Sequence, residues 1–441
     1  MVKKNIHLSL EPSGAELELC CIENSVTAAV DEGTIRGMKY QFSRYQIFVV
    51  GILVFLQFTI ILDFMILSPL GAVLMKTLSV TPSQFSLVVS AYAFSAGASG
   101  LLAAGFADKF DRKKLLMFFY TGFIIGTLLC GLAPTYEFLL AARMFTGIFG
   151  GVIGSIVFAI TTDLFPLEAR GRVMGFVQTS FAASQILGIP AGLYLANNWG
   201  WHSPFILIVI VSLLAGVVIL WKLKPIDGHL KLRTDRHAFH HLIDVITKKR
   251  YLQAFATVAL LSTGGFMLMP FGSAFSVHNL GIDINDLPTL YMITGLFSII
   301  TGPIVGRAAD HFGKYRVFVF GTAISITMVL IYTNLGVTPF LWAVVVNAVM
   351  FVGISSRMIP SQALMSAIPS PVNRGAFMSV SSSVQQISGG VASVIAGLLV
   401  EEGVGGHLEH FPSLGYVVVG ASLVTVTMMY QIHRLVHEKL D

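Results

Sequence analysis

Twelve long apolar runs limit what this chain can fold into. Each is close to or above the roughly 20 residues that an α-helix needs to cross the hydrocarbon core of a bilayer. A β-barrel would instead show shorter segments of alternating hydrophobicity. The sequence therefore predicts an all-α membrane protein with twelve transmembrane helices. The runs lie roughly at 46–74, 84–107, 115–133, 137–163, 171–196, 203–223, 251–276, 288–309, 315–335, 339–365, 374–400 and 413–434.

Charged residues are scarce and unevenly distributed between the loops. They make up 12% of the chain, against roughly 25% in an ordinary soluble domain. Nearly all of the 28 Lys and Arg residues lie in the N-terminal tail, in the loops after even-numbered runs and at the C-terminus. The other loops hold only Lys76 as a basic residue, together with the acids Glu137, Asp283, Asp286, Glu401, Glu402 and Glu409.

This asymmetry predicts the orientation of the chain. Because basic loops stay on the cytoplasmic side, we expect both termini in the cytoplasm of a multi-pass protein in the plasma membrane, the bacterial inner membrane. The net charge of +5 then reflects topology in the lipid bilayer and needs no nucleic acid partner.

A long polar stretch divides six runs from six. It predicts a cytoplasmic tail, an N-terminal six-helix bundle, a cytoplasmic linker, a C-terminal six-helix bundle and a short cytoplasmic C-terminus. The respective ranges are 1–44, 45–223, 224–250, 251–435 and 436–441. The linker is either a helix lying on the membrane surface, with its apolar face formed by Phe239, Leu242, Ile243 and Ile246, or a solvated tether.

Neither histidines nor cysteines form a recognisable metal site. His237, His240 and His241 of the linker have no ligand spacing and no carboxylate partner. The three cysteines (Cys20, Cys21 and Cys130) show no disulfide framework and no zinc spacing. We therefore expect no bound metal and no cofactor.

The two halves repeat each other. The stretch "AAGFADKFDRKK" at 103–114 has a second version, "VGRAADHFGKYR", at 305–316, which places Asp108 and Asp310 202 residues apart. Further on, "RGRVM" at 170–174 is echoed by "RGAFM" at 374–378, at an offset of 204. Two matches at nearly one offset favour an ancient duplication, and parallel six-helix repeats suit a transporter that rocks around a central site.

The charged loop resembles a signature of the major facilitator superfamily, Gly-x-Leu-Ala-Asp-Arg-x-Gly-Arg-Arg/Lys. The first copy keeps Asp108 and Arg112 but has Ala104 and Asp111 in place of the glycines. The second copy keeps Gly306, Asp310 and Gly313. The resemblance covers residues 45–435 and implies two six-helix pseudo-repeats, most similar to twelve-helix drug efflux and arabinose-efflux-permease-like proteins.

Two further stretches carry the resemblance. In the fourth run, "LLAARMFTG" is similar to the family's arginine motif and contains Arg143. In the fifth, "LGIPAG" contains Gly188, Pro190 and Gly192 and is similar to the antiporter motif, although its spacing departs from Gly-Pro-x-x-Gly-Gly. We expect these residues to bend the fifth helix.

The repeated aspartate predicts a conformational latch between the halves. Any Lys-rich loop would set topology, but acids contribute little to orientation, so topology alone does not explain an aspartate at one place in each half. We expect these carboxylates to pair with arginines and helix N-termini in one conformation and to release them in another. The expected latch residues are Asp108, Arg112, Asp310, Arg170 and Arg374.

Three ionisable residues, Asp63, Arg143 and Arg357, stand out because they lie away from the ends of the apolar runs, where charges are costly and mark functional candidates. Counting about 1.5 Å per residue places Asp63 and Arg143 in the outer half at similar depth, so that the two can pair. If that ion pair forms and breaks during transport, Asp63 gains and loses a proton and couples proton flow to transport. The alternative is a static structural pair. Arg357 falls in the inner half, with either backbone carbonyls or an anionic substrate as its partner.

Uncharged polar side chains in the runs are candidates for a substrate cavity, although each alone is more often a helix–helix contact. These candidates are Gln57, Tyr92, Gln178, Gln185, Tyr291, Asn347, Gln385 and Gln386. The charged residue Arg357 is a further candidate for the same cavity.

These features predict a monomeric secondary active transporter that exports small apolar or amphipathic molecules in exchange for protons, by alternating access. The alternatives are a sugar or metabolite efflux permease and a facilitator without a coupling ion. We do not expect an enzyme, because no nucleophile with an adjacent base falls inside the runs and "AADHFGKY" lacks the first glycine and the Ser/Thr of a phosphate loop. A membrane sensor would usually append a soluble domain, which we do not find.

Overall fold

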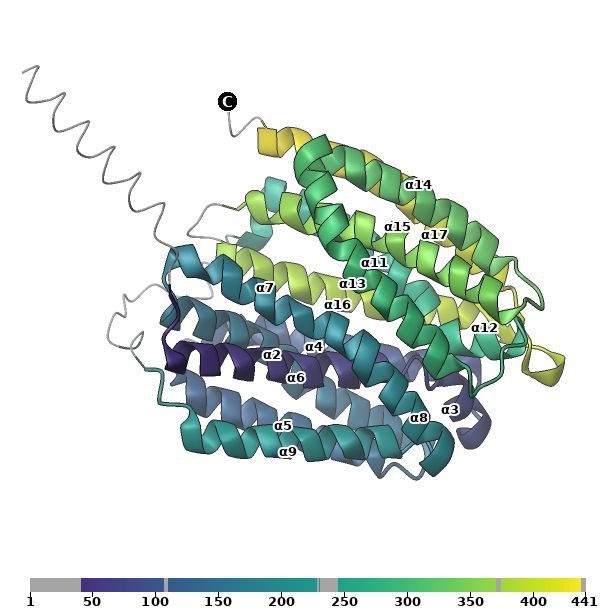
Figure 1. Ribbon diagram of the computed structural model, residues 1–441, viewed down its shortest axis with the longest axis horizontal. Helices are drawn as coiled ribbons and strands as arrows, with labels where there is room; N and C mark the ends of the chain where they lie inside the picture. The colour runs from purple at the N-terminus through teal and green to yellow at the C-terminus, as the bar shows by residue number, and fades with distance from the viewer. Residues whose placement is uncertain (1–40, 107–109, 228–229, 231–244, 370–373, 438–441) are drawn as a thin grey trace, which may run out of the picture. The chain divides into compact units, whose positions relative to one another are not determined.

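The computed structural model describes residues 41–106, 110–227, 230, 245–369 and 374–437 (Figure 1). Within these residues, ten helices are long and apolar enough to cross a membrane. They correspond to all the predicted runs except the fifth and the eleventh, which are helical but more polar. The predicted class, an all-α membrane protein, is confirmed.

The first half contains the helices α2 to α9. Their bounds are α2 (Arg44–Ile66), α3 (Gly71–Leu78), α4 (Pro82–Phe106), α5 (Arg112–Gly131), α6 (Tyr136–Leu164), α7 (Leu167–Ala183), η2 (Ser184–Gly188), α8 (Ile189–Trp199) and α9 (Ser203–Lys222). The first predicted run, 46–74, is divided between α2 and α3. Pro69 explains the break, because it has no N–H to continue the helix and disfavours helical geometry at Ser68.

The second half contains the helices α11 to α17. Their bounds are α11 (Lys249–Leu268), η4 (Met269–Phe271), α12 (Gly272–His278), α13 (Leu287–Phe312), α14 (Lys314–Thr333), α15 (Phe340–Ala367), α16 (Arg374–Leu399) and α17 (Phe411–His437). Between α16 and α17 lies a small antiparallel hairpin of β1 (Glu401–Glu402) and β2 (Leu408–Glu409), with the turn η5 (Val404–Gly406) at its tip.

The fifth predicted run is not one regular helix. Between α7 and α8 the segment Ser184–Gly188 is π-helical, and the N–H of Ile189 donates to the carbonyl of Ser184. Pro190 follows directly and has no N–H to offer to the preceding turn, which favours a wider local turn. The irregularity therefore coincides with the "LGIPAG" motif.

Close helix packing in the first half depends on glycines of α6. A Cβ at Gly147 would lie 2.5 Å from the carbonyl oxygen of Tyr92, and one at Gly151 would lie 2.3 Å from that of Ala96. Small residues of this kind allow membrane helices to approach each other at backbone distance. They bring α4 against α6, where the functional candidates Tyr92 and Arg143 lie.

The helices from Phe48 onward form one compact unit, in which the halves pack through α4 with α16 and through η2 and α8 with α13. We call the end of the bundle with loops 279–286 and 400–410 the acidic-loop end, and the opposite end the basic-loop end. At the acidic-loop end, buried side chains of both halves, including Ile66 and Phe271, form one apolar core. The basic-loop end of the second half has a separate core around Phe255 and Phe377.

Hydrogen bonds join the halves at the acidic-loop end. The hydroxyl of Ser273 donates to the carbonyl of Ser68 at 2.9 Å, and the hydroxyl of Ser68 donates to the carbonyl of Met269. The amide of Asn197 donates to the carbonyl of Ile284 at 3.0 Å. In this structure the two halves are therefore tied together at that end.

Candidate functional site

Asp63 of α2 and Arg143 of α6 form an ion pair inside the first half. Arg143 Nη1 lies 2.8 Å from Asp63 Oδ2, and both side chains are 0% exposed. The same nitrogen also donates to the backbone carbonyl of Asp63 at 3.3 Å. The two residues that the sequence places at similar depth are thus in direct contact.

Two more helices complete the surroundings of the pair. The hydroxyl of Thr127 on α5 donates to Asp63 Oδ1 at 3.0 Å. On α4, the ring of Tyr92 lies against the guanidinium, with 4.5 Å from the Arg143 Cζ to the ring centroid. A cation over an aromatic face is attracted by the ring quadrupole. Both carboxylate oxygens of Asp63 therefore have a donor, and Arg143 has an aromatic neighbour.

The guanidinium is only partly satisfied. Arg143 Nε and Nη2 are buried and make no hydrogen bond. Arg143 keeps its proton in proteins, whereas a carboxyl group can be neutralised. The arrangement can therefore exist in two states: with Asp63 ionised, the pair is closed; with Asp63 protonated, the main charge partner of Arg143 is lost.

Arg357 of α15 is the second buried arginine, and its environment differs. It is 6% exposed, and its Nη1 donates to the hydroxyl of Ser325 on α14 at 3.4 Å. Its Nε is buried without a hydrogen-bond partner. Across the described ranges, no carboxylate lies within ion-pair distance of Arg357, so its charge is not compensated.

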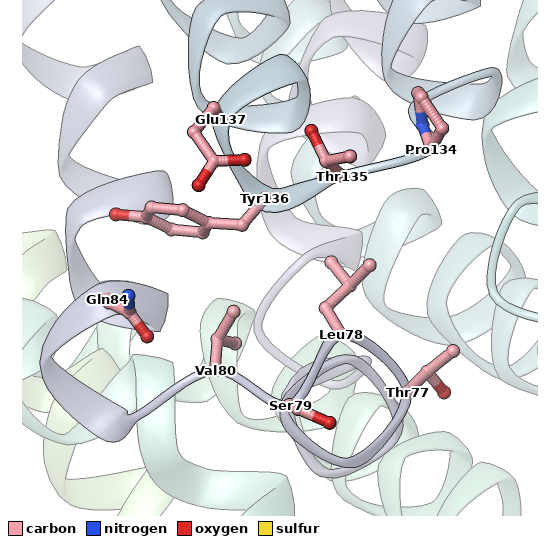
Figure 2. Close-up of a pocket in the computed structure, with 9 residues that line it drawn as sticks. All are labelled: Thr77, Leu78, Ser79, Val80, Gln84, Pro134, Thr135, Tyr136 and Glu137. Atoms are coloured by element: carbon pink, nitrogen blue, oxygen red, sulfur yellow. The ribbon is translucent and has the colours of Figure 1, made fainter.

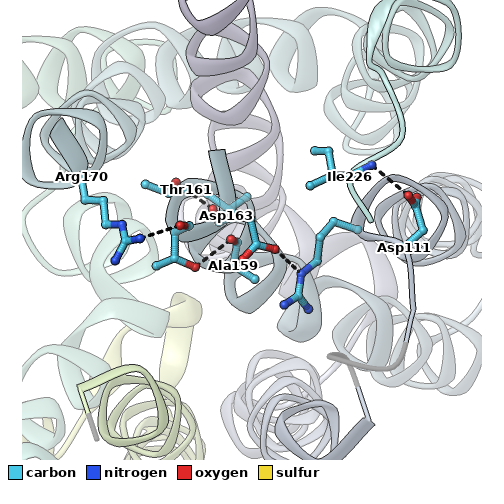
Figure 3. Close-up of polar contacts among 9 residues, drawn as sticks. Asp111, Ala159, Thr161, Asp163, Arg170 and Ile226 are labelled. Carbon is cyan, nitrogen blue, oxygen red and sulfur yellow. Dashed lines mark hydrogen bonds and ion pairs between the residues drawn. The ribbon is translucent and has the colours of Figure 1, made fainter. Parts of the chain in front are cut away.

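The basic-loop end of the first half contains a second polar cluster (Figure 3). Arg112 Nε, at the start of α5, lies 2.9 Å from Asp163 Oδ2 near the end of α6. Asp111 caps α5 by accepting from the N–H of Lys114 at 2.8 Å, and it also accepts from the N–H of Ile226 at 2.8 Å. These contacts tie α5, α6 and the segment after α9 together.

Arg170, near the start of α7, belongs to the same cluster. Its guanidinium donates to the carbonyl oxygens of Thr162 at 2.7 Å and of Phe165 at 3.0 Å. These carbonyls lie at the C-terminal end of α6, where unpaired acceptors and the helix dipole favour a cation. Arg170 therefore fixes the turn between α6 and α7.

The other expected latch residues are less informative. Asp108 lies outside the described residues, and Arg374 is the first residue of α16 but its side chain is not described. Asp310 is exposed near the end of α13. Sequence reasoning missed Asp163; its signal was an acid close to the end of an apolar run and close in sequence to Arg170.

The candidates for a substrate cavity lie in varied surroundings. Gln185 is buried on η2 beside Gly295 of α13, with its Oε1 unpartnered. Asn347 donates to its own helix, at Ala343 O, at 2.9 Å. Tyr92 is buried against Arg143. Of the remaining candidates, the partly buried ones are Gln57, Tyr291, Gln385 and Gln386, and the exposed one is Gln178.

A pocket of about 400 Å³ opens at the acidic-loop end between the α3–α4 turn and the start of α6 (Figure 2). It is lined by Thr77, Leu78, Ser79, Val80, Gln84, Pro134, Thr135, Tyr136 and Glu137. None of the intramembrane charges reaches it. Within the described part of the chain, no cluster of three or more His, Cys, Asp or Glu side chains could hold a metal ion.

Solved transporter structures share this fold. A bacterial homologue of the human lysosomal transporter Spinster, in an inward-facing and occupied conformation, superimposes with a TM-score of 0.66 at 16% identity, over 90% of this chain and 97% of that one. The nucleoside transporter NupG, as its D323A mutant, gives a TM-score of 0.66 at 15% identity, over 87% of this chain and 99% of that one.

Sequence comparisons identify the family. The MFS-type transporter YceJ of Bacillus subtilis (strain 168) is 24% identical over 348 residues, which is 78% of this chain and 87% of YceJ. Multidrug resistance protein 3 of the same organism is 32% identical over 152 residues, 34% of this chain and 30% of that protein. The sequence profile of the Major Facilitator Superfamily matches residues 53–275 and 254–436. The chain therefore belongs to the major facilitator superfamily and is a membrane transporter rather than an enzyme.

Proposed function

We propose that this transporter exports small apolar or amphipathic molecules from the cytoplasm in exchange for protons. The observation that carries the proposal is the fully buried ion pair between Asp63 and Arg143. An unpaired charge in the hydrocarbon region costs roughly 2.5–3.5 kcal/mol on insertion scales, so the pair can change its protonation only if the surrounding helices rearrange. The relatives whose names refer to multidrug resistance support efflux of small molecules.

Proton coupling follows from what each side chain can do. When Asp63 Oδ2 takes up a proton, it can no longer form an ion pair, while Arg143 remains charged. The contact between α2 and α6 weakens, and Arg143 needs a new partner or water. When the proton leaves, the attraction returns and draws the two helices together. Each cycle then moves a proton together with the conformational change.

The orientation of the cycle rests on the loop charges. With both termini in the cytoplasm of a bacterial inner membrane, the acidic-loop end faces outward. The hydrogen bonds between Ser68 and Ser273 and between Asn197 and Ile284 support a conformation closed toward the outside. The chain works as a monomer in this proposal, because each half supplies one side of the central pathway.

The cluster at the basic-loop end acts as the latch of the first half. Arg112 and Asp163 hold α5 to α6, and Arg170 holds the start of α7 to the end of α6. In the proposed latch, Asp108 and Asp310 join these contacts in one conformation and leave them in the other, and Arg374 takes the place of Arg170 in the second half. A sugar or metabolite efflux permease would use the same latch.

The test of proton coupling is Asp63→Asn. Asparagine resembles the protonated acid in shape, so we expect the variant to fold and to exchange substrate downhill. It should lose accumulation driven by an imposed pH gradient in proteoliposomes. The substrate for this assay comes from profiling the small molecules exported by cells that overexpress or lack the transporter.

The matched control is Asp283→Asn, which neutralises an exposed acid in a loop and should retain pH-driven accumulation. If Asp63→Asn also retains it, Asp63 is not the proton carrier and the static structural pair is the better account. If the wild type accumulates no substrate under a pH gradient but exchanges it downhill, the transporter is an uncoupled facilitator.

A further inference from the structure

The halves use equivalent helices around their buried arginines but differ in the carboxylate. In the first half, α2, α5 and α6 contribute Asp63, Thr127 and Arg143. In the second half, the corresponding first, third and fourth helices are α11, α14 and α15, and the last two contribute Ser325 and Arg357. The offset of 202 that relates Asp108 to Asp310 maps Asp63 onto residue 265, a glycine. The same offset maps Arg143 onto Val345, so Arg357 is not its counterpart in sequence. Among the described residues, the second half brings a hydroxyl and a guanidinium together without a carboxylate at ion-pair distance.

The space beside Arg357 is not filled by a side chain of α11. A Cβ at Gly264 would lie 3.7 Å from Arg357 Nη1 and 3.4 Å from Val418 Cγ1, which are ordinary contact distances. A Cβ at Gly265 would meet nothing within 4 Å. Gly264 thus leaves room next to the guanidinium, whereas Gly265 is exposed.

Unused hydrogen-bonding groups occur on two of the helices next to this space. Arg357 Nε is buried without a partner. On α17, one helical turn beyond Val418, the hydroxyl of Ser422 is also buried without a partner. Buried polar groups are almost always hydrogen-bonded, so each exception needs an explanation. A guanidinium presents a fork of donors that matches a carboxylate.

We propose that Arg357 binds the carboxylate of the transported molecule, so that the substrates are amphipathic organic acids. This inference rests on the proposed transport function and names its substrate class. The acid supplies the negative charge that Asp63 supplies in the first half, and its apolar part contacts the apolar helices around it. Because Arg357 is 6% exposed here, the acid enters when the halves move apart and is enclosed when they return.

The test compares an acid with its neutral amide. The probes are 1-naphthylacetate and 1-naphthylacetamide, which share an amphipathic frame and differ in charge; binding is measured as the rise in melting temperature of the purified, detergent-solubilised transporter. The wild type should bind the acid more tightly than the amide. Arg357→Gln should weaken acid binding by about 10- to 100-fold, the range expected for a charged hydrogen-bonded contact, and leave amide binding unchanged.

A second pair of variants tests whether a carboxylate of the protein can take the place of the substrate's carboxylate beside Arg357. Gly264→Asp places an acid within reach of Arg357 and should compete with the probe, weakening naphthylacetate binding by a similar factor. Gly264→Asn fills nearly the same volume without the charge, so it should weaken acid binding less than Gly264→Asp does. This pair keeps the proposal testable even if Arg357→Gln fails to fold.

Several results would overturn the proposal. They are equal binding of acid and amide by the wild type, no binding of the acid, unchanged acid binding in Arg357→Gln, and identical behaviour of the two Gly264 variants. Displacement of the acid by chloride or phosphate alone would identify an inorganic anion site instead. Asp63→Asn should still bind the acid, so a failure of proton coupling would leave this result unaffected.

Discussion

The two buried arginines show two ways of keeping a cation inside a membrane protein. Arg143 lies in direct contact with Asp63, and both side chains are 0% exposed. Arg357 lies on the corresponding helix of the second half, yet its Nη1 makes only a long, 3.4 Å contact to the hydroxyl of Ser325. The fourth helix of each half therefore carries a buried cation, and in the described part of the chain only Arg143 of the two has a carboxylate at ion-pair distance. The pairing of Arg143 can therefore change when Asp63 takes up a proton. Arg357, in contrast, can pair with a carboxylate only if a bound molecule supplies it.

The largest effect expected from this comparison concerns stability. Arg143→Leu leaves Asp63 buried without its counter-charge, and breaking a buried pair from one side costs roughly 3–5 kcal/mol. Arg357→Leu removes a buried charge that has no carboxylate partner, so we expect little loss of stability or a gain. Thermal unfolding of the purified variants in detergent measures both.

The double variant Asp63→Asn with Arg143→Leu is the control, because it removes both charges and should recover much of the stability lost by Arg143→Leu alone. Equal destabilisation by Arg143→Leu and Arg357→Leu would mean that Arg357 is a structural residue with contacts as strong as those of Arg143, and the comparison would fail.

Much of this comparison could be predicted from the sequence. Asp63 and Arg143 stand out because each interrupts an apolar run, and helix rise alone places them at similar depth. The duplication can also be recognised from the sequence, because the repeated charged loops stand out between the apolar runs. The family resemblance then gave the fold, which the matched residues 53–275 and 254–436 confirm.

The surroundings of the charges could not be predicted. Thr127 looks like any membrane threonine in the sequence, since such hydroxyls often bond to their own helix, as those of Thr146 and Thr161 do. Tyr92 was a cavity candidate, whereas its ring lies against Arg143. The lack of a carboxylate near Arg357 depends on which side chains of four helices meet, and no local pattern reports that. The polar fifth and eleventh runs were recognised as helices, but the π-helical segment before Pro190 was not foreseen.

An intermediate effect is expected when the second half receives a carboxylate. Gly264→Asp should form an ion pair with Arg357, because the substituted Cβ lies 3.7 Å from its Nη1. We expect Gly264→Asp to be more stable than Gly264→Asn by about 1.5–3 kcal/mol, the contribution of a hydrogen bond to a charged group. The readout is the difference in thermal unfolding between the two variants.

Repeating that pair in an Arg357→Gln background isolates the interaction. The advantage of aspartate over asparagine should disappear there, because the guanidinium that favours it is gone. If the advantage persists without Arg357, it comes from helix propensity or from another neighbour, and Gly264 does not mark the empty carboxylate position.

The smallest effect separates the two hydroxyls that accompany the arginines. Thr127 donates to Asp63 Oδ1 at 3.0 Å, within the normal range for a hydrogen bond, whereas Ser325 lies 3.4 Å from Arg357 Nη1, beyond that range. Thr127→Val keeps the shape of the side chain but leaves a buried carboxylate oxygen without its donor, so we expect a loss of about 1 kcal/mol in unfolding free energy. Thr127→Ser keeps the hydroxyl and should lose less unfolding free energy than Thr127→Val.

Ser325→Ala removes a weak contact, so its loss of unfolding free energy should be smaller than that of either Thr127 variant, as measured by thermal unfolding under identical conditions. A larger loss for Ser325→Ala than for Thr127→Val would show that Ser325 is the working partner of Arg357, and the second half would then hold its cation with its own side chains.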